Sequence, residues 1–263
     1  MSYQLTEILQ RCDKDDSAFF INQIDSYLNF TDDKGLREMD SMWDGKNIMP
    51  VPLANKIETE IRYLGSNDAA YLYRKLKGEN PAGVELEEII NDVCDVMKIK
   101  IRRVGTIESK LEMFCRAMVD KAFFDMSREK QVELLKKMDV SDEAIKIIMD
   151  QVNNKKKMLL PVILGLLGKQ TAMQIAQAII TAVIAVFIGQ QAAKILLANL
   201  MTKMPWLAAL GPIFIAILTG WTIIDFAGPA SRKTIPLMLY LGLICLRDGE
   251  TEEFWSDSNL VEH

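Results

Sequence analysis

Residues 170–193 read QTAMQIAQAIITAVIAVFIGQQAA, a run of 24 residues without a charge. A second uncharged run, MPWLAALGPIFIAILTGWTII, occupies residues 204–224. A helix needs about 20 residues to cross the hydrocarbon core of a bilayer, so both runs are long enough to span it. The neighbouring runs 158–168 and 234–246 are too short unless they lie at the interface or re-enter. We therefore expect a transmembrane helical hairpin.

Basic residues around the hairpin predict its orientation. The connector between the two runs carries Lys194 and Lys203, whereas the flanking segments carry six basic residues: Lys155, Lys156, Lys157, Arg232, Lys233 and Arg247. Because basic flanks stay on the cytoplasmic side, both termini are expected to be cytoplasmic and the membrane to be the bacterial inner membrane. Trp206 and Trp221 are 15 residues apart, about 22 Å along a helix, which matches two interfacial belts.

A soluble protein with the same hairpin buried in its core is the alternative, because helices that are hydrophobic on all sides also occupy large cores. A bundle built from roughly 150 other residues has limited capacity to enclose two such helices. This limit favours the membrane interpretation. A protein that stores the hairpin and releases it on demand lies between the two.

The rest of the chain has a different character. Of the 31 Lys+Arg and 36 Asp+Glu, only 6 and 7 lie in residues 158–263. Residues 1–157 instead show apolar residues at helical spacing, with no competing strand pattern. Residues 53–64 and 86–97 are clear examples, and Thr106, Ser127 and Ser141 are expected helix N-caps. The whole chain is therefore expected to be all-α.

Three units follow from these patterns. The stretch 32–52, rich in glycine, proline and charge, is expected to be a loop or a boundary. We expect a small N-terminal helical subdomain at 1–52, a cytosolic helical regulatory domain at 53–157, and a membrane domain with a cytosolic C-terminal tail at 158–263.

The composition argues against an enzyme. The single histidine, His263, cannot supply a Ser-His-Asp triad, a histidine metal site or a histidine acid–base pair inside the chain. The four cysteines are isolated, which predicts reduced, buried thiols. Adjacent acids such as Glu87 and Glu88 point about 100° apart on a helix and are typical of a solvated surface. We expect no catalytic residue, no metal and no cofactor, and the sequence has no P-loop or Rossmann fingerprint.

Two stripes run along the first span. The polar residues of one stripe follow spacings of 4, 3 and 4: Gln170, Gln174, Gln177 and Thr181. Small residues repeat these spacings on a neighbouring face: Ala178, Ala182, Ala185 and Gly189. Glutamine amides in hydrocarbon need partners, and small residues let helices approach closely. We therefore expect a homo-oligomer in which the polar stripe lines a pore. The alternative is that the glutamines only bond to the second span.

Charged residues outside the spans suggest regulation and anchoring. Two basic clusters are candidate sites for an anionic ligand, either a nucleotide or a short single-stranded oligonucleotide, or for anionic lipid headgroups: Lys98, Lys100, Arg102 and Arg103, then Lys155, Lys156 and Lys157. A solvated surface is the alternative for both. Asp225, at the membrane exit, is an expected partner of Arg232 or Lys233, or else a plain interfacial carboxylate.

Three blocks carry a family resemblance: LANKIETEIRYLG at 53–65, ELEEIINDVC at 85–94, and IDFAGPASRKTIP at 224–236. With them the chain resembles the bacterial YaaW-type family of uncharacterised proteins, linked to ubiquinol-cytochrome c chaperone-like domains. The resemblance implies no catalytic residue. It is compatible with the membrane effector of a two-component anti-phage system.

From these observations we expect a homo-oligomeric pore or ion channel in the inner membrane, gated by the cytosolic helical domain and serving anti-phage defence by depolarisation. Its expected partners are lipid, further copies of the chain, the anionic ligand and a regulatory protein. The rival function is a membrane-associated assembly chaperone or interaction protein without conductance.

Overall fold

The computed structural model describes residues 4–24, 33–66, 77–78, 83–102, 104–154, 158–188, 193–194, 196–198, 200 and 231–248. Every regular element in these ranges is helical and none is a strand, which confirms the all-α class. The helices are α1 (Gln4–Gln10), α2 (Lys14–Ile24), α3 (Asp33–Met42), α4 (Val51–Leu64), α6 (Leu86–Met97), α7 (Ile107–Asp125), α8 (Arg128–Lys137), α9 (Asp142–Met149), the π-helical turn η1 (Asp150–Asn154), α10 (Leu159–Leu167), α11 (Lys169–Ile188) and α14 (Ser231–Asp248).

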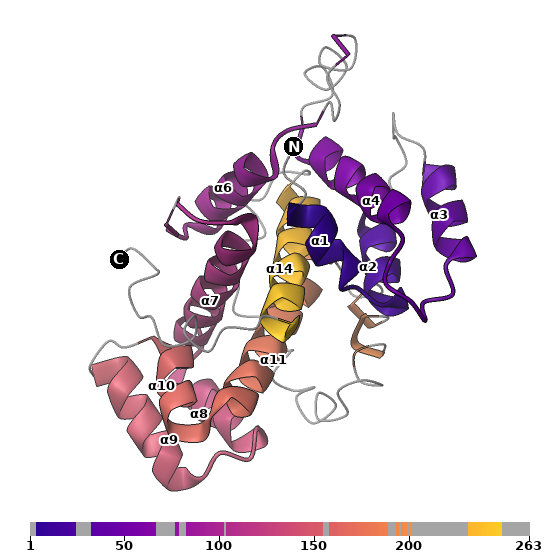
Figure 1. Ribbon diagram of the computed structural model, residues 1–263. Helices are drawn as coiled ribbons and strands as arrows, with labels where there is room; N and C mark the ends of the chain where they lie inside the picture. The colour runs from indigo at the N-terminus through magenta and orange to yellow at the C-terminus, as the bar shows by residue number, and fades with distance from the viewer. Residues whose placement is uncertain are drawn as a thin grey trace.

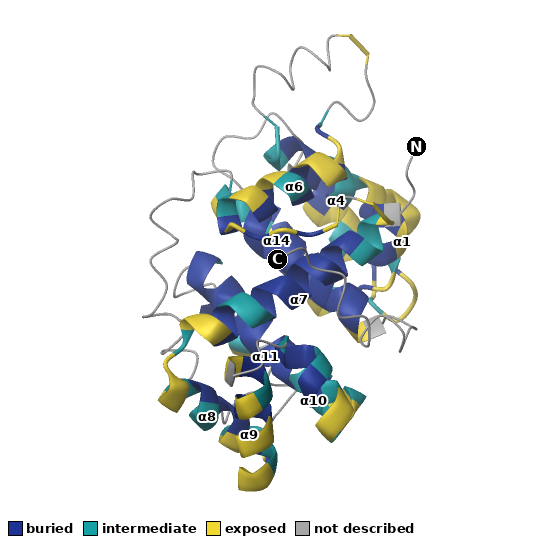
Figure 2. Ribbon diagram, turned by 90° about the vertical axis from the view of Figure 1, so that its left-hand side faces the viewer, coloured by how far each residue is buried: buried dark blue, intermediate teal, exposed yellow. Residues whose placement is uncertain are grey.

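Three buried helices form the centre of the molecule (Figure 1). α14 packs most extensively against α11 and α7, and α7 also packs against α11. The N-terminal helices α1, α2 and α4 contact α14, while α10 covers α11 and α7. Figure 2 shows the same division: α7, α11 and α14 are mostly buried, whereas α8 and α9 present an exposed face at the periphery. The first part of the chain and α11 therefore share one core.

Local sequence signals are confirmed where they were strongest. The buried residues of α6 are those of the expected apolar stripe: Leu86, Ile89, Ile90, Val93, Cys94 and Met97. The hydroxyls of Thr106, Ser127 and Ser141 each accept a hydrogen bond from the backbone N–H three residues later and so cap α7, α8 and α9. These signals act within one helical turn, which explains why the sequence reveals them.

Of the two interpretations of residues 32–52, the boundary stays a prediction, whereas the loop is wrong for the first half of the stretch, because α3 occupies Asp33–Met42. Leu36 is its buried anchor, while most other positions of the helix are exposed or half-buried. Leu36, Met39 and Met42 do follow helical spacing, but Gly35 and the charged neighbours of these residues resemble a break in the chain.

The uncharged runs have different outcomes. Residues 170–188 of the first long run lie in α11, and the two short runs at 158–168 and 234–246 fall in α10 and α14, so both short runs form core helices. Residues 204–224 lie outside the described residues. Of the helices that the structure describes, α11 alone is long and apolar enough to cross a membrane, and 78% of its most apolar window is buried inside the protein.

Candidate functional site

The polar stripe of α11 runs from the surface into the core. Gln170 is exposed, Gln174 is half-buried, Gln177 is 9% exposed and Thr181 is fully buried. The structure therefore places the four predicted residues along one helix, and their solvent exposure decreases from Gln170 to Thr181. α11 is covered by α7, α10 and α14.

Thr181 is the unusual member of the stripe. Within the described part of the chain its Oγ1 is buried and has no hydrogen-bond partner. A buried hydroxyl without a partner typically costs about 1–3 kcal/mol. The packing of α11 is therefore unfavourable at this one atom.

The small-residue stripe is buried as well. Ala178, Ala182 and Ala185 are at most 4% exposed, and Gly189 lies outside the described residues. The close helix packing that these residues allow is thus already used inside the molecule.

The first basic cluster follows α6. Lys98 ends this helix in the left-handed conformation, with φ 55°, and the next backbone N–H, of Ile99, donates to the Cys94 carbonyl at 2.8 Å. Ile99 and Ile101 are buried, whereas Lys98, Lys100 and Arg102 are exposed, as their alternation indicates. Arg103 and Lys155 to Lys157 lie outside the described residues, so the second cluster is not placed.

A cavity of about 650 Å³ opens beside this cluster. The residues around it include Asn91, Asp95, Ile99, Lys100, Ile101 and Arg102. Two basic side chains and one carboxylate give the rim a positive balance, and the amide of Asn91 adds hydrogen-bonding capacity. The thiol of Cys94 also borders the cavity, but burial raises its pKa to about 12, which makes it a poor nucleophile.

The expected membrane-exit residues are placed only in part. Arg232 is exposed in the first turn of α14, and Lys233 donates to the carbonyl of Ile24 at 3.4 Å, which ties α14 to the end of α2. Asp225 lies outside the described residues. Its pairing with Arg232 or Lys233 stays a prediction.

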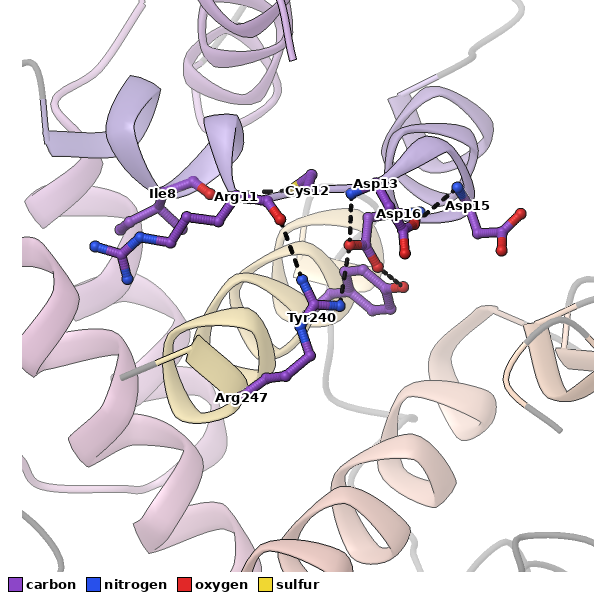
Figure 3. A network of polar contacts seen from close by, with 8 residues as sticks. All are labelled: Ile8, Arg11, Cys12, Asp13, Asp15, Asp16, Tyr240 and Arg247. Carbon is purple, nitrogen blue, oxygen red and sulfur yellow. Dashed lines mark hydrogen bonds and ion pairs between the residues drawn. The ribbon is translucent and has the colours of Figure 1, made fainter. Parts of the chain in front are cut away.

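Sequence reasoning missed a polar network between α2 and α14, in which Asp16 and Tyr240 are buried and Arg247 is exposed (Figure 3). The carboxylate of Asp16 accepts from Tyr240 Oη at 2.8 Å and from Arg247 Nη1 at 3.1 Å. These partners are 224 and 231 residues away in sequence, so no local pattern points to them.

A second missed group lies on α7. Glu112 and Asp120 are two turns apart on this buried helix, and burial raises the pKa of Glu112 to about 7 and that of Asp120 to about 6. The neighbouring charge of Glu108 raises the pKa of Glu112 further, whereas Arg116 and Arg11 lower it. Asp120 Oδ1 accepts from the Leu159 N–H at 2.8 Å and so caps α10 from another helix. The described residues contain no group of three His, Cys, Asp or Glu placed to hold a metal ion.

Comparison with known proteins finds one similar curated sequence, a UPF0174 protein of Helicobacter pylori strain J99. It is 26% identical over 200 residues, which cover 76% of this chain and 74% of that protein. No family model matches the chain. No solved structure matches it significantly.

Proposed function

We propose that the protein is a membrane effector that stores α11 in a helical core and inserts it into the bacterial inner membrane as part of a homo-oligomeric pore. The observation that carries this proposal is α11 itself. It combines the length and composition of a membrane span with a polar stripe that ends, among the described residues, at an unpartnered hydroxyl on Thr181. An apolar core gains nothing from such a stripe.

The stripe has a physical use in an oligomer. Around a water-filled lumen, Gln170, Gln174, Gln177 and Thr181 would bond to water or to one another, which removes the cost of burying the Thr181 hydroxyl. The alanine face, at Ala178, Ala182 and Ala185, would let neighbouring copies approach closely. Insertion thus exchanges one set of helix contacts for another.

The cavity beside Lys100 and Arg102 suggests how the release of α11 from the core is controlled. Its volume lies in the range of small-molecule sites, and its basic rim suits an anionic ligand such as a nucleotide or the end of a single-stranded oligonucleotide. α6, which forms one wall, contacts both α7 and α14, the helices that cover α11. A ligand bound in the cavity would therefore contact a helix that packs against α7 and α14, the two helices that cover α11.

The proposal includes the second span at 204–224, cytoplasmic termini and a role in anti-phage defence by depolarisation. These elements rest on the sequence patterns alone.

Single-channel recording tests the lumen assignment. The full chain is reconstituted in planar bilayers under a KCl gradient, and Gln174→Lys is compared with Gln174→Glu. A charge in the lumen should shift the reversal potential toward anion selectivity for lysine and toward cation selectivity for glutamate. Gln174 is half-buried in the stored state, so neither variant places a new charge in the core.

Thr171→Lys and Thr171→Glu are the matched controls, since Thr171 is half-buried at the same end of α11 but lies outside the stripe. They should keep the reversal potential of the unaltered chain. Conductance that responds equally to both positions would contradict the lumen assignment. A chain without any conductance would refute the pore.

The burial of α11 supports a second candidate, a helical interaction protein or assembly chaperone without conductance. In that case α11 is an ordinary core helix, because most of its apolar window is covered by the protein's own helices. This function predicts a stoichiometric protein partner and silent bilayers in the same recordings.

A further inference from the structure

We propose that Asp16, Tyr240 and Arg247 form a latch, hereafter the Asp16 latch, by which the N-terminal helices hold α14 closed over α11. The inference concerns the regulation of the proposed membrane function and rests on that function for its consequence at the bilayer. The latch itself is a property of the folded chain and is measurable without a membrane.

The geometry of the latch is concentrated on one carboxylate (Figure 3). Asp16 has a side chain only 3% exposed, and it receives three donors: the Tyr240 hydroxyl, the Arg247 guanidinium and the backbone N–H of Asp13, the last at 3.0 Å. Arg247 also donates through Nη2 to the Arg11 carbonyl at 3.4 Å. Tyr240 and Arg247 of α14 thus both bind the Asp16 carboxylate, and Arg247 also binds the backbone just before α2.

Aromatic packing continues the contact along α14. The ring of Tyr240 stacks on Phe19 with centroids 4.0 Å apart and meets Phe20 edge-on at 5.5 Å. At the other end of α14, Lys233 donates to the Ile24 carbonyl. α2 therefore contacts α14 near both ends of α14, and the Asp16 carboxylate is the buried charge in that contact.

A single buried charge makes such a contact sensitive to change. A buried carboxylate is stable only while its donors remain, and its removal takes the Asp16 acceptor away from the buried Tyr240 hydroxyl. Weakening Asp16 therefore destabilises both sides of the α2–α14 contact at once. Since α14 is packed on α11 as well as on the N-terminal helices, opening of α14 uncovers α11.

Hydrogen exchange of the full chain without lipid tests the latch. Asp16→Asn keeps the shape of the side chain and removes its charge, and Asp15→Asn, at the exposed neighbouring position of the same helix, is the matched control. Amides of α14 and α11 should exchange at least about tenfold faster in Asp16→Asn, the size of effect that loss of one charge-assisted hydrogen bond produces. The control should exchange like the unaltered chain.

Tyr240→Phe provides a milder variant that keeps the aromatic stacking and removes only the hydroxyl. It should accelerate the same two helices by a smaller factor and keeps the test valid if Asp16→Asn fails to fold. The double variant Asp16→Asn with Arg247→Gln should be no faster than the more affected single variant, because both changes break the same contact.

Three outcomes separate the latch from its alternatives. Unchanged exchange in α11 and α14 overturns it. Equal acceleration of α8 and α9 overturns it too, because Asp16 would then contribute only to global stability. Faster exchange in α2, α14 and α11, with α8 and α9 unchanged, supports it.

Dye leakage from vesicles of phosphatidylethanolamine and phosphatidylglycerol tests whether the latch controls activity at the membrane. Leakage that rises for Asp16→Asn but not for Asp15→Asn supports the latch and the membrane function together. Selective exchange without leakage supports the latch and refutes the membrane function.

Discussion

Ionisable groups on α7 show how burial alters single residues. Glu112 is enclosed between helices, and its pKa rises from 4.5 to about 7, mainly through loss of contact with water. Below pH 4.5 the carboxyl is protonated in both the folded and the unfolded chain. Between pH 4.5 and 7 only the folded chain keeps the proton, so its contribution to stability is lost as pH rises through this window.

Replacement of Glu112 by glutamine should remove this pH dependence. At pH 5 the variant and the unaltered protein should have similar free energies of unfolding. At pH 8 the variant should be more stable, by an amount on the order of 3 kcal/mol, because the rise of the Glu112 pKa from 4.5 to about 7 corresponds to that difference. Urea denaturation at both pH values measures the difference.

Glu88→Gln, at an exposed position of α6, is the control and should reproduce the pH profile of the unaltered chain. A Glu112→Gln variant that is less stable at pH 8 would show that the charged carboxylate stabilises the fold.

Thr181→Val tests the buried hydroxyl. In the part of the chain that is described, the hydroxyl lacks a partner, so an apolar side chain of similar shape should raise the free energy of unfolding by about 1 kcal/mol. Thr171→Val is the contrast, because Thr171 is half-buried and donates to the Leu167 carbonyl at 3.4 Å. It should not stabilise. Loss of stability in Thr181→Val, measured by thermal unfolding, would contradict an unsatisfied hydroxyl.

At the scale of elements, the distance between α7 and α14 depends on one glycine. A Cβ at Gly242 would lie 2.4 Å from Cys115 Sγ and 2.7 Å from the Leu111 carbonyl oxygen, both on α7. Only a residue without a side chain permits this approach, in which the Cys115 thiol also contacts the Leu239 carbonyl at 3.4 Å. The helix pair that covers α11 is therefore sterically tight.

Gly242→Ala should separate α14 from α7 and lower the melting temperature, at a cost of about 1–3 kcal/mol typical of overpacking. Gly165→Ala in α10 is the matched control, since a Cβ there meets nothing within 4 Å and alanine favours the helix by about 0.5–1 kcal/mol. Opposite signs for the two substitutions are expected in thermal unfolding. Equal effects would mean that the α7–α14 contact adjusts freely.

At the scale of the whole molecule, the two compositional halves of the chain are interlocked. α7, from the charged half, is buried against α11 and α14 from the apolar half, and α14 is in turn held by α1, α2 and α4. Each half therefore buries part of its apolar surface against the other.

Separate expression of residues 1–157 and 158–263 should make this interlocking measurable. Each fragment alone should expose apolar surface and aggregate, whereas co-expressed fragments should co-purify as a stoichiometric complex. Affinity pull-down with a tag on one fragment, followed by size-exclusion chromatography, tests this. A soluble, monomeric 1–157 fragment that does not bind the 158–263 fragment would show that the charged half folds on its own.

The sequence by itself determined the helical class, the stripe of α6, the caps of α7 to α9 and the alternation of Lys98 to Arg102, because these signals act over two to four residues. Tertiary structure alone decided that α11 is enclosed by α7, α10 and α14, since lipid and a protein interior are both apolar and select the same residues. It alone joined Asp16 to Tyr240 and Arg247 and raised the pKa of Glu112, because long-range contacts and burial leave no trace in local spacing.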